Sequence, residues 1–428
     1  MRWTIGAACL LALGAATPAD AAAPFQPRPV VDQVIALIGA NYVFPEKRAG
    51  IVAKLKDDEA QGRYDVASAA ELVDRLGADM SAAGHDRHLW IQYDPDQNKA
   101  LRTAGNGDEN AFFERQAALR NMGYEELRIL PGNIRYVNLT GFMWRKDGAR
   151  IVADSARFLS EGDAVIVDLR QNGGGSAQAV QNLVSYFLPP DNRALMYFHK
   201  GANGAAKPTR VLTRLAAPRM VGKPLYVLIS GSTGSAAEEF AYHVEQFHLG
   251  TLVGHATAGA ANNDTLYPVG DGFIVSVSTD RPEHPVSHTN WEGTGVPPDV
   301  AVADDQALAQ AQLLALKALA ARPGAKADAY DWAIAGLEAH MHPVTVDPAT
   351  QASYAGIYGD RTIRLQDGKL IFQRAGRDPT TLSPLSPDLF EFGNSAHVRL
   401  RFRREAGRVT GFDMITDDGQ TIAVPRSP

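Results

Sequence analysis

The chain has 428 residues, which is too long for one ordinary hydrophobic core and predicts two or three domains. Its formal net charge of -6, with a pI near 6.0 and no basic stripe, argues against a nucleic-acid-binding surface. No apolar run after the first residues approaches the roughly twenty residues of a membrane-spanning helix.

The first residues have the pattern of a secretory signal peptide. A positive start at Arg2 is followed by an apolar stretch from Ile5 to Ala16 and then by small residues. We therefore expect residues 1–23 to be removed and the mature protein to be soluble and exported to the periplasm. The only cysteine, Cys9, lies inside this segment, so the mature chain would have no thiol for disulfides or cysteine catalysis.

Residues 24–125 predict a helical bundle followed by a strand and a loop. Three amphipathic helices are expected between Pro29 and Ala83, because apolar residues recur at helical spacing. The alternating segment His88–Tyr93 predicts a strand. The polar segment Asp94–Glu114 contains a glycine-rich run and predicts an exposed, mobile loop.

Residues 126–325 predict an α/β core, because strands and helices alternate in this region. Continuously apolar strands indicate a sheet covered by helices on both faces. An antiparallel strand is expected at 271–278 and a closing helix at 307–321. The other strands are expected at 133–139, 164–169, 225–230 and 251–254, and the other helices at 149–159, 176–187 and directly after Ser235.

The last part of the chain predicts a helical connector at 326–345 and a small antiparallel β domain at 346–428. Its hairpin signals are Asp367-Gly368, Ala406-Gly407 and Asp418-Gly419. We expect a barrel or a sandwich whose role is packing or partner binding. The expected strands are 354–358, 362–365, 369–373, 389–392, 398–403 and 409–414.

The segment Ser232–Phe240 carries the most chemical information. It follows an apolar strand and opens a helix, so Ser235 would lie at a tight turn with backbone N–H groups of the first helical turn beside it. These donors and the positive end of the helix dipole suit an oxyanion, which makes Ser235 a candidate nucleophile. The alternative is a purely structural capping box completed by Glu238.

A nucleophilic serine needs a base. No lysine lies between Ser235 and Lys317, so a downstream lysine close to the serine is not available. Among the histidines, His243 and His248 lie on the helix away from its N-terminus, whereas His88 opens a strand beside the bundle. The run His85-Asp86-Arg87-His88 also permits a metal site, although no third ligand group stands at convincing spacing.

Two glycine-rich segments complete the candidate site. The run Asp168–Gly175 lets backbone N–H groups approach an anion, either as a phosphate loop or as half of an oxyanion hole opposite Ala236. A phosphate loop is disfavoured because the Gly-Lys-Ser/Thr ending is missing. Asp168 and Arg170 are expected to form a structural ion pair. Glu292 lies in a turn-rich segment and is either a solvated acid or a group that orients the histidine.

These motifs together resemble serine peptidases of the C-terminal-processing and tricorn type, the S41 group, which also includes interphotoreceptor retinoid-binding proteins. The resemblance covers roughly residues 85–305. The matching segments, in family order, are Asp168-Leu-Arg-Gln-Asn-Gly-Gly-Gly175, Ser235-Ala-Ala-Glu238, Thr257-Ala-Gly259 and Gly295-Val-Pro-Pro-Asp299.

The resemblance implies a histidine-dependent site. The lysine of the C-terminal-processing branch would fall on Ala260, so the chain is closer to the tricorn-like branch, in which a histidine and a glutamate assist the serine. By motif these fall on His88 and Glu292. Arg87 replaces a supporting serine, and a cation there would lower the basicity of the imidazole. The implied fold is a crotonase/ClpP-like α/β core, and the C-terminal part more weakly resembles lipocalin-like domains.

The expected function is that of a secreted serine endopeptidase acting on peptides or unfolded protein tails. In this interpretation Ser235 attacks the carbonyl, His88 relays the proton, and Glu292 fixes the imidazole. The N–H groups of Gly174 and Ala236 bind the oxyanion, and no metal or organic cofactor takes part. The alternatives are a binding protein for a hydrophobic small molecule and an esterase on the same fold.

Overall fold

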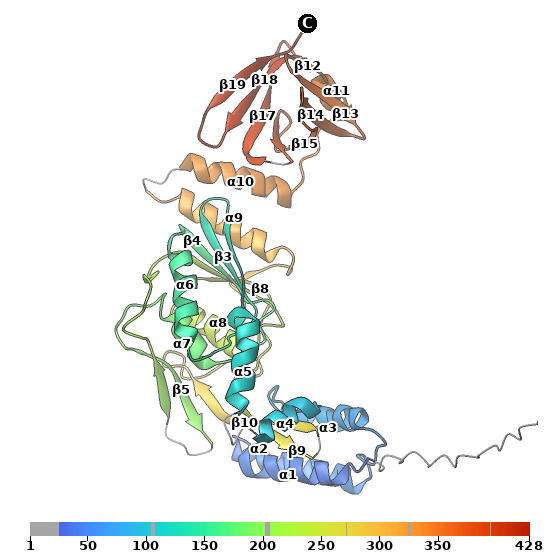
Figure 1. Cartoon of the computed structure of the whole chain (residues 1–428), viewed down its shortest axis with the longest axis vertical. Coiled ribbons are helices and arrows are strands. Elements are labelled where there is room, and N and C mark those ends of the chain that lie inside the picture. The colour runs from blue at the N-terminus through green and yellow to red at the C-terminus, as the bar shows by residue number, and fades with distance from the viewer. Residues whose placement is uncertain (1–24, 104–107, 202–205, 271, 324–326, 394) are drawn as a thin grey trace, which may run out of the picture.

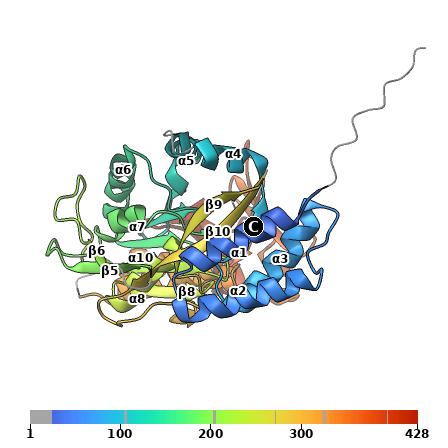
Figure 2. The ribbon, with the colours of Figure 1, turned by 90° about the horizontal axis from the view of Figure 1, so that it is seen from below.

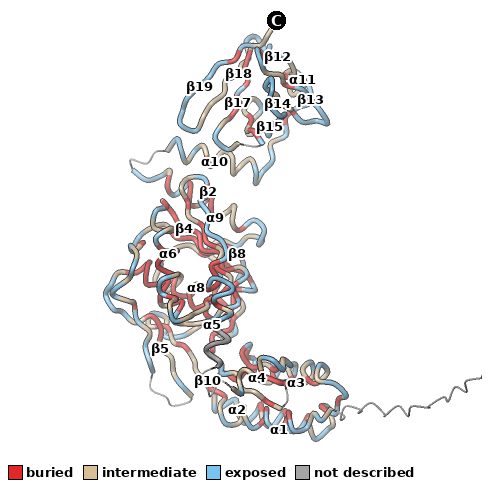
Figure 3. Tube along the Cα trace, viewed as in Figure 1, coloured by how far each residue is buried: buried red, intermediate tan, exposed pale blue. Residues whose placement is uncertain are grey.

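The computed structural model describes residues 25–103, 108–201, 206–270, 272–323, 327–393 and 395–428. The expected signal peptide and Cys9 lie outside these residues. Figure 1 shows an elongated molecule in which a helical part, an α/β core and a C-terminal sheet follow one another along the long axis. Buried residues concentrate in the strands and helices of the core and in the centres of the two outer parts (Figure 3).

The helical part packs against a sheet that the chain completes much later. The three predicted helices are confirmed, as α1 (Arg28–Asn41), α2 (Pro45–Ala60) and α3 (Ala69–Gly84). Their apolar faces share one core with strands β9 (Asn263–Val269) and β10 (Phe273–Glu283), which Figure 2 shows beside α1. The body that contains the first helices therefore also contains residues from beyond position 260.

Strand β10 holds this sheet together. It pairs antiparallel with β9, with β1 (Trp90–Tyr93) and with β5 (Ala194–Lys200), and β5 pairs with β6 (Lys207–Arg210). The antiparallel strand predicted at 271–278 is thus confirmed and longer than expected. Because β1 pairs with β10, the segment just before β1 is brought to the edge of the core.

The loop predicted at Asp94–Glu114 is wrong, since the chain forms α4 (Pro95–Thr103) and α5 (Asp108–Leu119) here. The buried side chain of Asn98 donates to the backbone carbonyls of Val269 and Phe273. Hydrogen bonds to the β9–β10 hairpin thus anchor α4, which has little apolar surface for a periodicity argument. The run Gly105-Asn106-Gly107 lies outside the described residues.

The core contains the predicted sheet with helices on both faces. Its strand order is β11-β8-β7-β4-β3-β2, and all neighbours are parallel except β2 and β3. Alternate residues of the strands face α6, α7 and α8 on one side and α9 on the other. The bounds are β2 (Tyr124–Leu130), β3 (Ile134–Leu139), α6 (Gly148–Ser160), β4 (Ala164–Asp168), α7 (Ala177–Val184), β7 (Leu225–Ile229), α8 (Ala236–Gln246), β8 (Thr251–Gly254), β11 (Val300–Ala301) and α9 (Ala307–Ala320).

The C-terminal part is an antiparallel sheet with its own aromatic core, as predicted. Its strands pair in sequence order from β12 to β19, and Ser427 N donates to Ile357 O at 2.8 Å, which brings the end of the chain to the first strand. Helix α10 (Ala327–Met341) connects it to α9. The bounds are α11 (Pro348–Tyr354), β12 (Gly356–Tyr358), β13 (Arg361–Gln366), β14 (Lys369–Arg374), β15 (Thr380–Pro384), β16 (Leu389–Phe392), β17 (Ser395–Glu405), β18 (Arg408–Thr416) and β19 (Thr421–Pro425).

Candidate active site

Ser235 occupies a strained turn between β7 and α8. It is the N-cap residue of α8, with φ 50° and ψ -120°, a backbone conformation that non-glycine residues rarely adopt. The preceding strand is fully buried, whereas Ser235 itself is partly exposed. The turn therefore lifts the hydroxyl to the surface of the core beside the N–H of Ala236, at the positive end of the helix dipole.

The carboxylate of Glu238 holds this turn in place. Glu238 is fully buried and accepts from the backbone N–H of Ser235 at 2.8 Å, which is half of the predicted capping box. It also accepts from Thr257 Oγ1 at 2.6 Å and from the backbone N–H groups of Gly259 and Ala260 at 2.6 and 2.9 Å. Burial raises the pKa of Glu238, and these hydrogen bonds oppose the rise. Glu238 thus ties the serine turn to the loop that carries Ala260.

His88 comes from the helical part, from the turn between α3 and β1. Its side chain is buried, with 8 % exposed, and its Nδ1 has no hydrogen-bond partner among the described residues. Its backbone is fixed at both ends, because His88 N donates to Asp86 Oδ1 at 2.9 Å and His88 O accepts from Ser276 Oγ. Since Ser276 lies on β10, the pairing of β1 with β10 positions the imidazole.

Two carboxylates stand beside this imidazole. Ligand atoms of Asp86, His88 and Glu292 all lie within 4.8 Å of one another. Glu292 Oε2 accepts from the backbone N–H groups of Ala261 and Asn262 at 2.6 and 3.0 Å, whereas its Oε1 is buried and unpartnered. Burial and the charge of Asp86 raise the pKa of Glu292, and the backbone hydrogen bonds and His88 oppose them. One Glu292 oxygen therefore has no partner among the described residues.

Asp86 is a site residue for which the sequence argument found no catalytic role. Its Oδ2 accepts from Tyr42 Oη at 3.1 Å and from Asn262 Nδ2 at 3.2 Å, so it links α1 to the loop of the core. With His88 and Glu292 it also forms a donor set of the kind that divalent cations accept, with Glu292 as the third group missing from the sequence pattern. In the sequence, the spacing Asp86-x-His88 was the only sign of this donor set, because Glu292 comes from a distant segment.

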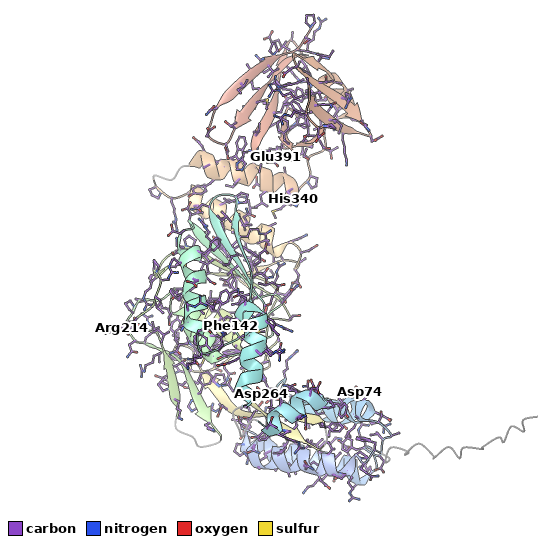
Figure 4. The ribbon with its side chains drawn as sticks, viewed as in Figure 1. Asp74, Phe142, Arg214, Asp264, His340 and Glu391 are labelled. Atoms are coloured by element: carbon purple, nitrogen blue, oxygen red, sulfur yellow. The ribbon has the colours of Figure 1, made fainter. Side chains whose placement is uncertain are left out.

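His88 and Ser235 line the same cavity, although they come from different parts of the chain. The cavity has a volume of about 780 Å³ and lies where the helical part meets the core. Two of its residues are labelled in Figure 4, Phe142 in the core and Asp264 at the junction. The full lining is His88, Trp90, Gln116, Arg120, Phe142, Met143, Trp144, Gly173, Gly175, Ser176, Ser235, Asp264 and Leu266.

The glycine-rich segment lies directly against the serine. A Cβ on Gly174, which has φ +116°, would lie 2.7 Å from the Cβ of Ser235. The N–H of Gly174 donates to Asn172 Oδ1 at 2.9 Å, so this predicted oxyanion donor is already engaged in this structure. The next residue, Gly175, lines the cavity, and no hydrogen bond from its N–H is found within the described part of the chain.

The remaining predicted residues fall as follows. Arg87 is exposed, so its cation points to solvent beside the buried imidazole. Ala260 lies next to the serine turn, bonded to Glu238, where a lysine would stand in the other branch. His243 is a buried core residue. The structural ion pair of Arg170 with Asp168 is confirmed, at 2.6 Å between Nη2 and Oδ2.

Comparisons with known proteins agree with these motifs. The sequence profile of peptidase family S41 matches residues 133–302. A second profile, described as the N-terminal domain of Peptidase_S41 in eukaryotic IRBP, matches residues 25–121. The two profiles together cover the helical part and the core, and so contain Ser235, His88 and Glu292.

Two curated relatives are similar to part of this chain. A carboxyl-terminal-processing protease of Synechocystis sp. is 29% identical over 181 residues, which cover 40% of this chain and 39% of the relative. The carboxy-terminal processing protease CtpA of Bacillus subtilis is 26% identical over 180 residues, covering 42% of this chain and 36% of the relative. The chain thus spans about two fifths of the length of these relatives.

Solved structures of similar proteins include a lipoprotein from Streptococcus agalactiae, with a TM-score of 0.46 and 16% identity over 69% of this chain and 98% of that one. The photosystem II D1 C-terminal processing protease has a TM-score of 0.42 and 16% identity over 66% of this chain and 94% of that one. Among the described residues, no helix is long and apolar enough to cross a membrane. The two S41 profiles match residues 25–121 and 133–302, and this part of the chain belongs to peptidase family S41.

Proposed function

We propose that this chain is a secreted serine endopeptidase that hydrolyses peptides or unfolded protein tails through Ser235, His88 and Glu292. The observation that carries the proposal is that Ser235 and His88 line one cavity of about 780 Å³ although they come from separate parts of the molecule. A serine in a strained turn at a helix N-terminus and a buried imidazole in the same cavity are the nucleophile and the base that acyl transfer requires.

The reaction proceeds in two steps. Ser235 Oγ attacks the peptide carbonyl carbon while His88 accepts the hydroxyl proton and passes it to the leaving amine. Water, deprotonated by His88, then attacks the acyl-enzyme and releases Ser235. Glu292 orients the imidazole: ligand atoms of the two side chains lie within 4.8 Å of each other, and Glu292 Oε1 and His88 Nδ1 are both buried without a partner among the described residues. Catalytic hydrogen bonds are often long in a substrate-free site, and this proposal requires that the two groups form one when substrate is bound.

The negative oxygen of the tetrahedral intermediate needs N–H donors. Ala236 supplies one at the start of α8. Gly174 was the predicted second donor, but its N–H serves Asn172, so Gly175 supplies the second N–H and Gly174 provides the close approach to Ser235. Because these donors belong to backbone that is fixed before substrate arrives, they cost little reorganisation during the reaction.

The substrate class follows from the cavity and the relatives. The aromatic and apolar residues of the cavity wall suit side chains that only an unfolded segment presents. The relatives bear the name of C-terminal processing proteases. Export to the periplasm rests on the signal-peptide pattern of residues 1–23. The crotonase/ClpP-like core and the lipocalin-like C-terminal part remain predictions from the resemblance.

The test is labelling with a fluorophosphonate, read by intact mass. The wild type should gain one adduct, Ser235→Ala should gain none, and His88→Ala should react at a rate lower by several powers of ten. Ser232→Ala is the matched control, since Ser232 is exposed in the same turn, and it should label like the wild type. A wild type that stays unlabelled would contradict the proposal.

A hydrophobic ligand-binding role is the second candidate, favoured by the aromatic residues Trp90, Phe142 and Trp144 in the cavity wall. A binder without an activated serine would not react with the fluorophosphonate but would bind an apolar fluorescent probe in this cavity. An esterase on the same machinery would label and would hydrolyse small esters but not peptides.

A further inference from the structure

Ser235 also lines a second, much smaller cavity. Its volume is about 10 Å³, which is room for about one water molecule. Ser235, Ala236 and Gly175 line it, so it opens at the position where the carbonyl carbon of a substrate would be attacked. The rest of its wall includes Phe198, Pro282 and Trp291, together with the polar residue Asn263.

Glu239 supplies the carboxyl group of this small cavity. It lies four residues after Ser235 and therefore on the same side of α8. Only 5 % of the residue is exposed, and burial raises the pKa of its carboxyl to about 8. Its only ion-pair partner among the described residues is His243, whose Nε2 lies 3.5 Å from Glu239 Oε1.

A chain of two buried histidines lies beside this carboxyl group. The backbone N–H of Val286 donates to His284 Nδ1 at 3.2 Å, so the proton of this neutral ring stands on Nε2. His284 Nε2 lies 3.2 Å from His243 Nδ1 and donates to it, which places the proton of His243 on its own Nε2. Burial lowers the pKa of both histidines to about 3, so both rings are neutral near pH 7. His243 Nε2 thus carries its proton 3.5 Å from Glu239 Oε1 without a hydrogen bond to it among the described residues, and the carboxyl group keeps its hydrogen-bonding capacity for a ligand.

We propose that the small cavity receives the side chain of the substrate residue whose carbonyl Ser235 attacks, and that Glu239 selects serine at that position. This residue is called the acyl-side residue below. A methyl or hydroxymethyl group matches the size of the cavity, and only the hydroxymethyl group exchanges a hydrogen bond with the carboxyl group of Glu239. The inference rests on the proposed peptidase function and adds its substrate preference.

The opposite preference, for a lysine or arginine side chain, conflicts with two observations. A cavity of about 10 Å³ cannot hold a four-carbon stem or a guanidinium group without displacing the wall. Moreover, a carboxyl group with a pKa of about 8 is largely uncharged near neutral pH, so it offers little charge to a cation. An uncharged carboxyl group both donates and accepts, which is what a hydroxyl group needs.

The experiment compares kcat/KM for four peptides that differ only in the acyl-side residue: serine, alanine, valine and lysine. The wild type should favour serine over alanine by about fivefold to tenfold, the worth of one hydrogen bond. The wild type should also have a higher kcat/KM for the serine and alanine peptides than for the valine and lysine peptides. Glu239→Gln keeps a donor and an acceptor and should retain most of the preference for serine. Glu239→Met removes both and should bring the serine-to-alanine ratio close to one.

Each outcome separates this inference from the proposed function. A wild type that reacts with the fluorophosphonate but cleaves valine or lysine peptides best would overturn the cavity assignment and leave the serine peptidase intact. A serine-to-alanine ratio unchanged in Glu239→Met would overturn the role of Glu239 alone, provided that the variant melts like the wild type. A wild type that neither labels nor cleaves would defeat both.

Discussion

At the scale of single residues, the site depends on carboxylates with distinct tasks. Glu238 accepts four hydrogen bonds and has a structural role. Glu292 keeps one oxygen free beside His88, and Glu239 presents its carboxyl group to the small cavity. Because burial raises the pKa of all three, the hydrogen-bond partners of each group decide its role.

Glu292→Gln is expected to slow the fluorophosphonate reaction of Ser235 by about 10²-fold to 10⁴-fold, as when the orienting acid of a serine triad loses its charge. The amide keeps the shape but no longer stabilises a protonated imidazole. The measurement is the second-order labelling rate at pH 7. Glu245→Gln, a change on the partly exposed end of α8, is the control. An unchanged rate in Glu292→Gln would leave Asp86 as the orienting group.

Glu238→Gln is expected to destabilise the fold by about 1–3 kcal/mol, because an amide nitrogen would face backbone N–H donors that need an acceptor. The variant should also lose labelling, since the strained turn at Ser235 is held by this group. Urea unfolding of the two proteins gives the stability difference. If Glu238→Gln unfolds like the wild type, the four hydrogen bonds contribute little.

At the scale of elements, the sequence predicted those whose pattern is local. The helices with apolar periodicity, the apolar parallel strands and the hairpins with Asp-Gly or Ala-Gly turns all form. Strands β6 and β9 were missed because they are partly exposed and rich in polar residues. Helix α4 was missed because hydrogen bonds of Asn98, rather than an apolar face, attach it to the β9–β10 hairpin.

The same distinction between local patterns and contacts distant in sequence holds for the candidate site. Ser235 and Glu238 could be predicted because a short local motif contains both. The meeting of His88 with Ser235 could not, because it depends on β1 pairing with β10, a contact between residues nearly 200 positions apart whose register no local pattern encodes. Only the family resemblance led us to expect that His88 and Ser235 lie in the same site.

The buried histidines in and beside α8 should make the free energy of unfolding depend on pH. His243 and His284 have pKa values of about 3 in the folded chain, so between pH 3 and 6.5 the unfolded chain binds more protons and stability falls as the pH falls. Glu239, with a pKa of about 8, has the opposite sign between pH 4.5 and 8 and loses stability as the pH rises.

We therefore expect His243→Leu to lose less stability than the wild type between pH 7 and pH 4, because it removes one of the two buried imidazoles. The measurement is the urea midpoint at both pH values. His255→Gln is the control, since His255 is exposed and its change should leave the pH dependence as it is. An equal fall in His243→Leu and wild type would show that His243 is not the group that takes up the proton.

At the scale of the whole molecule, the candidate site combines residues from two parts of the chain, the helical part and the core. The helical part has a hydrophobic core of its own and contributes His88, Asp86 and Tyr42, while the core contributes Ser235 and Glu292. The seam between them is strand β10, which pairs with β1 beside the helices and with β5 of the core, and the hydrogen bond from Asn262 to Asp86. The C-terminal sheet stands at the far end of the long axis from this seam (Figure 1).

The C-terminal sheet is attached through α10, and Arg399 is its anchor. The guanidinium carbon lies 3.9 Å from the ring centre of Trp332, and Nη2 donates to Trp332 O at 2.6 Å.

Arg399→Met should lower the melting temperature of the C-terminal part, because a buried cation–π contact and a hydrogen bond are lost. Since the sheet lies far from Ser235, the labelling rate should stay within about twofold of the wild type, the range expected for a distant, independent site. Calorimetry and labelling of the same full-length sample test both points. A labelling rate that falls together with the melting temperature would mean that the C-terminal sheet controls access to the serine.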